Sequence, residues 1–442
     1  MLSFAERKQQ LADQIRASRG SELALAKDTS NLFRDRAGSP RRLDVSRFNH
    51  VLQVDAVHGW VDVEGMTPYD ALVEATLQQG VMPCVVPQLK SITIGGAVAG
   101  VGIEASSFKY GLAHETMYEL EVLLGDGSIV TCSADNEYRD LFFGFPNSYG
   151  TLGYALRVRT KAVPVKPYVQ LSHIRFGRGH DCFRDLERWC NDPTVDFLDG
   201  VVFDAGEVYL TLGRFVGAAP YVSDYKFQHI YYRSLRTREV DYLTVADYLW
   251  RWDTDWFWCS KNLGAQNPLL RRLLGRKRLN SRFYTKVMRW NSRWRLTHRF
   301  DRFSGYRHRE SVIQDVDIPL EHAVEFLDFF QREVGILPIW ICPIRSAGHW
   351  SLYPMDPGQI YVNFGFWDVV RRQDPYPTGH FNRRIEEKVR QLGGIKSLYS
   401  DSYYGHEAFW EQYNGSSYGQ LKRRYDPQGT FKDLYAKCVL RA

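Results

Sequence analysis

The chain has 442 residues, 44% of them hydrophobic. This length exceeds what a single hydrophobic core usually supports, so two lobes are expected. The net charge of +6 is modest, and the seven cysteines are odd in number without a C-x-x-C pair, which argues against a disulfide framework and favours reduced thiols. No stretch reaches the roughly 18 apolar residues of a membrane span, and the first twenty residues lack a signal-peptide core, so we expect a cytoplasmic chain.

The first eighty residues predict short alternating elements. In chain order these are a helix over 4–18 that ends at Gly20, strands over 51–55 and 59–65 with period-2 alternation, and a helix from Thr67 to Gly80. Thr67 is the expected N-cap of that second helix, and Pro68 is expected in its first turn.

A glycine-rich run follows between Pro87 and Gly111. Backbone N–H groups can approach two adjacent phosphates only where side chains are absent, so this run predicts a loop that binds a dinucleotide diphosphate. The spacing differs from G-x-G-x-x-G, and no helical pattern opens behind it. Taken alone, such a run is also typical of an ordinary turn.

Two alternating runs around Gly125-Asp126-Gly127 predict a hairpin, and Asp135 is the expected N-cap of a helix through Phe143. Gly150-Thr151-Leu152-Gly153 precedes a strand that ends near Pro164. Together with the earlier elements this predicts an α+β unit up to about residue 165.

Beyond Pro167 the composition becomes aromatic and basic. Between Arg251 and Glu310 there are sixteen Lys and Arg against four Asp and Glu, and half of the twelve tryptophans lie between Trp250 and Trp294. Such a mixture suits an anionic membrane interface, so residues 250–309 are expected to dock peripherally on a membrane. A solvated face over buried aromatics is the alternative; nucleic acid is not expected, because no binding motif accompanies the patch.

The order of these motifs resembles the FAD-binding domain of the vanillyl-alcohol-oxidase (PCMH-type) flavoproteins, and within them most nearly the FAD-linked Δ24-sterol reductase (Diminuto) group. The segments that carry the resemblance are Gly102–Ser107 with Lys109-Tyr110-Gly111, Pro338–Pro343, Leu398–Asp401 and Glu407–Glu411. They keep the same order in both halves, from about residue 20 to the C-terminus.

The resemblance implies an α+β, two-lobed PCMH-type fold. Its parts would be an FAD-binding domain over 1–165, a substrate domain over 166–355 and a segment over 356–442 that returns to the flavin side. FAD would be held without a covalent bond, because the first phosphate loop offers no His or Cys, although that loop also lacks the usual glycines. The implied cofactor residues are Lys27, Thr29, Ser30, Asn31, Gln88, Thr93, Ile94, Gly95, Gly96, Gly100, Gly102, Ser106, Ser107, Gly150, Thr151 and Gly153.

Hydride transfer at the flavin also needs a group that handles a proton, either a Tyr or a carboxyl with a raised pKa. The candidates from the resembling motifs are Glu104, Tyr361, Asn363, Tyr399, Asp401 and Tyr403. Each tyrosine can equally be a packed core residue. No metal-ligand spacing is present, so no metal is expected.

The resemblance therefore implies an FAD-dependent reductase of a C=C bond in a sterol or other isoprenoid lipid, with NADPH as electron donor by analogy. Two alternatives stay open. One is oxidation of an alcohol on a sugar or polyprenyl-linked sugar, and the other is a non-catalytic lipid-binding protein that has lost its cofactor.

Overall fold

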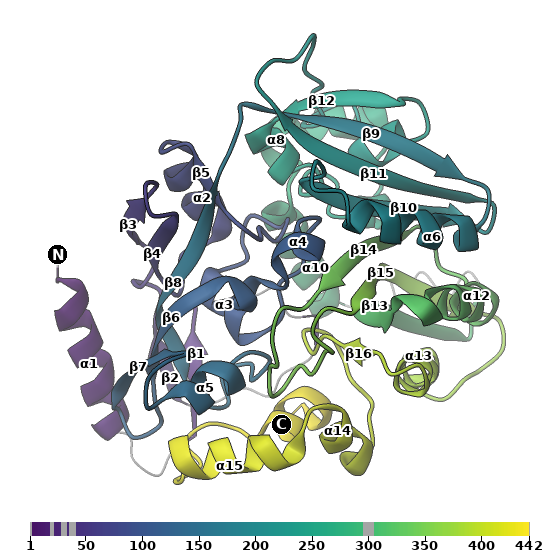
Figure 1. The fold of residues 1–442 in the computed structure, drawn as a ribbon. Helices are drawn as coiled ribbons and strands as arrows, with labels where there is room; N and C mark the ends of the chain where they lie inside the picture. Colours follow the sequence, from purple (N-terminus) through teal and green to yellow (C-terminus); the bar gives the residue numbers. More distant parts are fainter. Residues whose placement is uncertain (1, 18–21, 28–32, 35–40, 295–304, 442) are drawn as a thin grey trace.

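A computed structural model describes residues 2–17, 22–27, 33–34, 41–294 and 305–441. Two antiparallel sheets dominate it, with helices between and around them (Figure 1). One continuous hydrophobic core joins the smaller sheet to the inner face of the larger one. The α+β class predicted from the sequence is confirmed, and the contact between the sheets positions the site.

The smaller sheet is built from the N-terminal third of the chain. In spatial order its strands are β3 (Val51–Asp55), β4 (Trp60–Glu64), β8 (Tyr154–Pro164), β6 (Met117–Leu123) and β7 (Ile129–Ser133), and β5 (Val81–Pro83) pairs with β8. The helices of this part are α1 (Phe4–Ala17), α2 (Tyr69–Leu77), α3 (Ile94–Ala99), α4 (Ser107–Tyr110) and α5 (Arg139–Gly144). A separate parallel pair joins β1 (Leu23–Ala26) to β2 (Arg41–Asp44). The predicted strands and hairpin are confirmed.

Two predicted helix caps are wrong. Pro68 occupies the N-cap of α2, because the Thr67 hydroxyl donates to the carbonyl of His50 at 3.1 Å instead of capping the helix. Helix α5 begins only at Arg139, because the Asn136 side chain accepts the amides of Ser133 and Tyr138 and holds a turn after Asp135.

The larger sheet has eight strands. In spatial order they are β12 (Val240–Thr244), β9 (Tyr168–Phe176), β11 (Glu207–Val216), β10 (Phe197–Asp204), β14 (Ile339–Arg345), β15 (Ile360–Arg372), β13 (His308–Pro319) and β16 (Ile395–Lys396). Its outer face packs against α6 (Gly179–Cys190), α12 (Ala323–Glu333) and α13 (His380–Gln391). Because its central strands are covered on both faces, they read as nearly continuous apolar runs.

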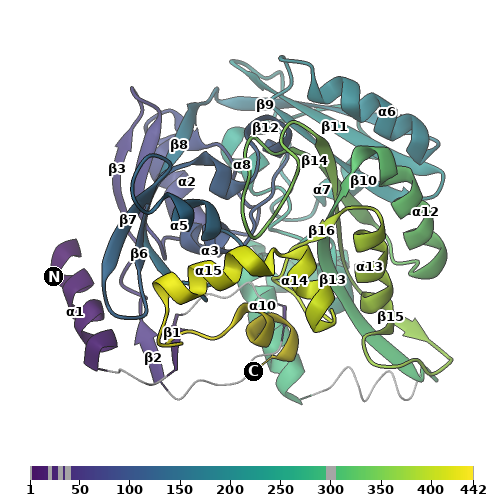
Figure 2. The same ribbon diagram turned by 60° about the horizontal axis from the view of Figure 1, so that its bottom comes forward.

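Helix α7 (Tyr231–Ser234) lies between β11 and β12. The described residues between β12 and β13 form α8 (Val245–Leu249), α9 (Pro268–Leu274) and α10 (Ser281–Trp294). After β16 the chain crosses back to the smaller sheet. There α15 (Gly415–Tyr425) packs on α5, and α14 (His406–Gln412) lies beside it (Figure 2). From about residue 398 the chain lies against the smaller sheet, whereas residues 360–372 form β15, which pairs with β13 and β14 in the larger sheet. The expected division at residues 165 and 355, with a C-terminal segment on the flavin side, stays a prediction.

Candidate active site

The glycine run folds as a short helix and not as an open loop. Helix α3 spans Ile94–Ala99, and the hydroxyl of its N-cap Thr93 accepts the amide of Gly96 at 3.3 Å. Since Gly has a low helix propensity, the sequence alone favoured a loop here. A second short helix, α4, follows at Ser107–Tyr110, so the prediction that no helical pattern opens behind the glycines was wrong.

Close packing of α3 against the segment around Gly65 explains why a glycine is needed at position 95. The amides of Ile94 and Gly95 donate to the carbonyls of Thr67 and Gly65 at 3.0 and 2.8 Å. A Cβ on Gly95 would lie 2.6 Å from the Gly65 oxygen, which is backbone and cannot give way easily. Two of the amides expected to face a phosphate thus bind within the protein, and the role of Ile94 and Gly95 toward FAD stays a prediction.

The next two glycines lie where this segment meets other parts of the chain. A Cβ on Gly100 would be 3.2 Å from the ring of Tyr149, and one on Gly102 would be 2.8 Å from the Cβ of Ala113. The Tyr149 amide also donates to the carbonyl of Ala99 at 2.8 Å. Tyr149 is thereby fixed beside the glycine run.

Polar residues of the same segment divide into two kinds. Ser106 donates its hydroxyl to the carbonyl of Cys84 at 2.7 Å, and Ser107 accepts the amide of Glu104 at 3.1 Å, so both hold the backbone in shape. Gln88 is different, because its amide nitrogen and oxygen are buried without a hydrogen-bond partner in the described part of the chain. Its side chain is therefore available to a ligand.

The third predicted cofactor segment forms a tight turn. Gly150 and Gly153 have φ values of +75° and +154°, which favour glycine, and the Thr151 hydroxyl donates to the carbonyl of Ser148 at 2.8 Å. Lys422 donates from α15 to the Thr151 carbonyl at 2.7 Å. The turn is thus held from the C-terminal side.

The first phosphate loop is described only at its ends. Thr29, Ser30 and Asn31 lie outside the described residues, whereas Lys27 directly follows β1. At the other end Arg34 is 7% exposed, lies 4.9 Å from the centre of the Tyr149 ring and donates from one Nη to the carbonyl of Leu398. Its Nε and second Nη have no partner among the residues that the structure describes. Arg34 was not among the residues predicted from the sequence.

Two carboxyl groups missed by the sequence prediction lie on the inner face of β13. Asp317 is fully buried, and its two oxygens accept from the Asn363 amide and the Tyr353 hydroxyl, each at 2.7 Å. Asp315 lies two residues earlier on the same face and hydrogen-bonds with Tyr399. The predicted candidates Asn363 and Tyr399 therefore meet at carboxylates that were not predicted.

Burial shifts the titration of both groups. It raises the pKa of Asp315 to about 7, with a further rise from the charge of Asp317, against hydrogen bonds from Tyr399 and Asn363. Burial likewise raises the pKa of Asp317 to about 6, against hydrogen bonds from Tyr353 and Asn363. A carboxyl that titrates near neutrality can hold a proton for a reaction.

Tyr361 lies on the same face of β15 as Asn363, and its hydroxyl accepts the amide of Asp356 at 3.2 Å. Glu104 lies elsewhere, in a buried cluster where Arg251 contacts it at 3.0 Å and contacts Asp199 at 2.8 Å. Glu104 and the carboxyl pair thus occupy separate places on the inner face of the larger sheet.

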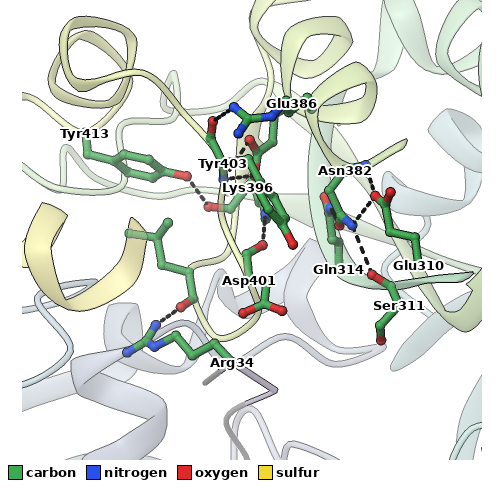
Figure 3. Close-up of polar contacts among 12 residues, drawn as sticks. Arg34, Glu310, Ser311, Gln314, Asn382, Glu386, Lys396, Asp401, Tyr403 and Tyr413 are labelled. Carbon is green, nitrogen blue, oxygen red and sulfur yellow. Dashed lines mark hydrogen bonds and ion pairs between the residues drawn. The ribbon is translucent and has the colours of Figure 1, made fainter. Parts of the chain in front are cut away.

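Asp401 and Tyr403 belong to a third group, drawn in Figure 3. Arg441 contacts both the Asp401 carboxylate at 3.4 Å and the Tyr403 hydroxyl at 3.0 Å. Behind them, Lys396 donates to the Glu386 carboxylate and to the Asp401 carbonyl, each at 2.6 Å, and Glu386 accepts the Tyr403 amide (Figure 3). This buried pair fixes the segment that carries Tyr399, Asp401 and Tyr403.

The tryptophans of the middle region form a core wall. Trp252, Trp256 and Trp258 are 2%, 6% and 0% exposed. Phe257 stacks on Trp252 at 5.1 Å and contacts Trp367 of β15 at 4.4 Å. Trp256, Phe257 and Trp258 all have φ between 47° and 55°, a strained conformation for bulky side chains that is found mostly where function requires it. The prediction that these tryptophans face a membrane is wrong, because packing buries them; the side chains of Trp290 and Trp294 lie outside the described residues.

Comparisons with known proteins extend over most of the chain. Residues 7–133 match the FAD binding domain family. The chain is 28% identical over 408 residues to Delta(24)-sterol reductase of Rattus norvegicus, covering 88% of this chain and 75% of that protein. It is 25% identical over 439 residues to Delta(24)-sterol reductase of Arabidopsis thaliana, with 89% and 76% covered. Cytokinin dehydrogenase 1 of Arabidopsis thaliana is 28% identical over 144 residues, 32% of this chain and 25% of that protein.

Fold and comparisons together define an FAD-dependent oxidoreductase that carries a PCMH-type FAD-binding domain. Over 88–89% of its length the chain is similar to delta(24)-sterol reductases. The alternative of a non-catalytic lipid-binding protein is thereby set aside.

The residues at the seam between the two sheets fit FAD. Buried polar atoms of Arg34, Gln88, Tyr149, Asn363 and Ser400 have no hydrogen-bond partner in the described ranges. A guanidinium matches a diphosphate, and amide and hydroxyl groups match the ribityl chain and the ring edge of the flavin. When bound, FAD supplies hydride transfer at N5.

Proposed function

We propose that this oxidoreductase reduces a C=C bond of a sterol or another isoprenoid lipid, with NADPH as electron donor. The observation that carries the proposal is the extent of similarity. The delta(24)-sterol reductases match 88–89% of the chain, which includes the larger sheet, whereas the cytokinin dehydrogenase matches only 32%. The second similarity supports the cofactor and says little of the substrate.

A group of packed aromatic side chains on the inner face of the larger sheet, here called the aromatic wall, supports the proposal of an apolar substrate. Phe257, Trp340 and Trp367 pack together on the inner face of the larger sheet, with ring centres 4.4 to 6.3 Å apart. Aromatic side chains offer large apolar area with little rotamer entropy to lose, which suits a rigid sterol ring system. Oxidation of an alcohol on a sugar or polyprenyl-linked sugar is the second candidate, and a polyprenyl group would use the same wall.

The expected result with purified protein is a yellow chain whose FAD is released by acid precipitation. Anaerobic NADPH should bleach the flavin, and a sterol with a Δ24 double bond should restore the colour in one turnover. Both steps are followed by absorbance, with the saturated sterol as control. Flavin that stays in the acid pellet would contradict non-covalent binding. Reduction of the flavin by a polyprenyl-linked sugar, without reoxidation by any alkene, would favour the second candidate.

Peripheral docking on an anionic membrane is the second part of the proposal, and α9 is its proposed contact. Leu269 and Leu273, one turn apart on α9, are 70% and 78% exposed. Arg272, Lys277 and Arg278 are exposed next to them. Apolar side chains beside cations are the composition that binds anionic lipid surfaces. Within the described ranges no helix is both long and apolar enough to cross a bilayer.

Arg271 does not belong to this surface, since it is 1% exposed and pairs with Asp255. Neutralising Arg272, Lys277 and Arg278 to Gln should weaken binding to phosphatidylserine vesicles by on the order of a hundredfold, at about 1 kcal/mol per cation. Leu269→Gln with Leu273→Gln should also weaken it, and flavin content should not change. The matched control is Arg184→Gln with Arg188→Gln on α6, where both side chains are exposed. Equal flotation of all variants at low salt would contradict the proposed contact.

A further inference from the structure

We propose that the carboxyl group of Asp315 holds and delivers the proton that completes the reduction, and that Asp317 and Asn363 position it. This inference rests on the proposed function. The observation behind it is that three parts of the chain meet at Asp315. Strand β13 carries Asp315 and Asp317, β15 carries Asn363, and the segment after β16 carries Tyr399.

The contacts give the two carboxyls different tasks. Both oxygens of Asp317 are taken by Asn363 and Tyr353 at 2.7 Å, and the side chain is completely buried. Asp317 is therefore an anchor. Asp315 is only partly buried, yet its Oδ1 has no hydrogen-bond partner in the described part of the chain, and neither has the Oδ1 of the fully buried Asn363. These unsatisfied atoms point to a ligand at Asp315, because buried polar groups are normally paired.

The position of Asp315 suits a group that works between a cofactor and an apolar substrate. On one side it meets Tyr399, whose carbonyl accepts the amide of Phe33 at 2.9 Å and whose hydroxyl accepts from Trp367 at 2.8 Å. Phe33 directly precedes Arg34, so this side leads to the residues that fit FAD.

Asp315 also borders the aromatic wall, through Trp367. A Cβ on Gly365 of β15 would lie 2.7 Å from the Asp315 Oδ1 and would also collide with the Trp367 ring. Because Gly365 has no side chain, the Asp315 carboxyl and the Trp367 ring can come close together at this position. An alkene carbon seated on the Trp367–Phe257 pair would lie next to a proton donor and away from bulk water.

Burial, with a smaller contribution from the charge of Asp317, favours the protonated form of Asp315 near neutral pH. The titratable groups that face it are Asp317 on its own strand, Tyr399 from the segment after β16, and Tyr149, beside which lies Arg34. Burial, together with Asp317, raises the pKa of Asp315 to about 7. A donor works best when its pKa lies near the working pH.

The chemistry balances. One alkene carbon receives a hydride, which is two electrons and a proton, from FAD that NADPH has reduced. The other carbon receives H⁺ from the Asp315 carboxyl, the π bond is lost and two C–H bonds form. Asp315 is left as a carboxylate and regains its proton from solvent.

The test compares Asp315→Asn, Asp317→Asn and the surface control Asp185→Asn, all loaded with FAD. In the parent chain the visible spectrum of bound FAD should titrate with a midpoint near pH 7, and reoxidation by a Δ24 sterol should slow tenfold per pH unit above it. Asp315→Asn should abolish the spectral midpoint and slow reoxidation by about 10²- to 10⁴-fold with FAD content retained. Asp317→Asn should move the midpoint to lower pH, because a neighbouring negative charge is lost.

Two outcomes overturn different claims. If no isoprenoid alkene reoxidises the parent flavin, the proposed function fails, but the spectral titration still reports on Asp315. If Asp315→Asn keeps both the spectral midpoint and the parent rate, Asp315 is not the donor. Because Asn is nearly isosteric with Asp, a folded variant is expected, and its FAD content confirms it.

Discussion

Replacing Arg251 with Met should lower the free energy of unfolding by about 3–5 kcal/mol, the range for breaking a buried ion pair by removing one partner. Arg251 is fully buried and contacts Glu104 at 3.0 Å and Asp199 at 2.8 Å, both of which are also buried. Met keeps the apolar volume but leaves two carboxylates without a cation. Glu104 follows the glycine run and Asp199 lies on β10, so the loss falls at the junction of the two sheets. Urea unfolding followed by tryptophan fluorescence measures it.

An arginine-to-methionine change on the surface serves as a control, because it removes the same charge from an exposed position. Arg178→Met removes an arginine that is 79% exposed and pairs with Asp181, so its effect should stay below about 1 kcal/mol. Adding Glu104→Gln and Asp199→Asn to Arg251→Met should recover part of the loss, since no unpaired charge then remains buried. Equal stability of Arg251→Met and Arg178→Met would contradict the proposed role of the cluster.

Lys396→Met should destabilise the chain by about 3–5 kcal/mol for the same physical reason and should also weaken FAD retention. Lys396 is fully buried, and its Nζ contacts the Glu386 carboxylate and the Asp401 carbonyl at 2.6 Å. Without it, the segment that holds Tyr399 against Asp315 loses its anchor. Chemical unfolding gives the stability, and the ratio of absorbance at 450 to 280 nm after gel filtration gives the FAD content.

The loss in Lys396→Met should grow with pH. Unpaired and buried, Glu386 would have a folded-state pKa above its unfolded value, so the protonated form is favoured in the folded chain. Stability then falls as the pH rises above about 4.3, the unfolded value. Glu386→Leu added to Lys396→Met should remove this pH dependence. The control Lys388→Met breaks a pair with the exposed Glu325 and should change little. A loss in Lys396→Met that is the same at pH 5 and pH 8 would count against the buried pair as its cause.

Local patterns in the sequence were sufficient for several elements. The alternation over Val51–Asp55 and the turn glycines of the 119–130 hairpin predicted strands correctly, because side-chain period and turn chemistry are local. The order of motifs also identified the flavin class. The caps at Thr67 and Asp135 failed, since the Thr67 hydroxyl donates to the backbone carbonyl of His50 and the side chain of the neighbouring Asn136 holds the turn after Asp135.

The alternation Val312-Ile313-Gln314-Asp315-Val316-Asp317 contained a usable signal for the carboxyl pair. Charged residues two apart in an otherwise apolar strand lie on one face, and a charge facing a core is unusual. What the sequence could not supply was the partner of each group, because Asn363, Tyr353 and Tyr399 lie 36 to 84 positions away from the carboxyls along the chain.

The sequence by itself therefore determined the cofactor class, the α+β order and most of the strands of the smaller sheet, all of which depend on short-range periodicity and on glycines. Tertiary structure alone decided that Trp252 and Trp258 are core and not membrane anchors, and that Arg271 is an internal ion-pair partner while Leu269 is exposed. It also decided that Asp315 meets Tyr399. Burial and pairing depend on which distant segments pack together, and the raised pKa of Asp315 follows mainly from that burial, with a smaller contribution from Asp317 two residues away.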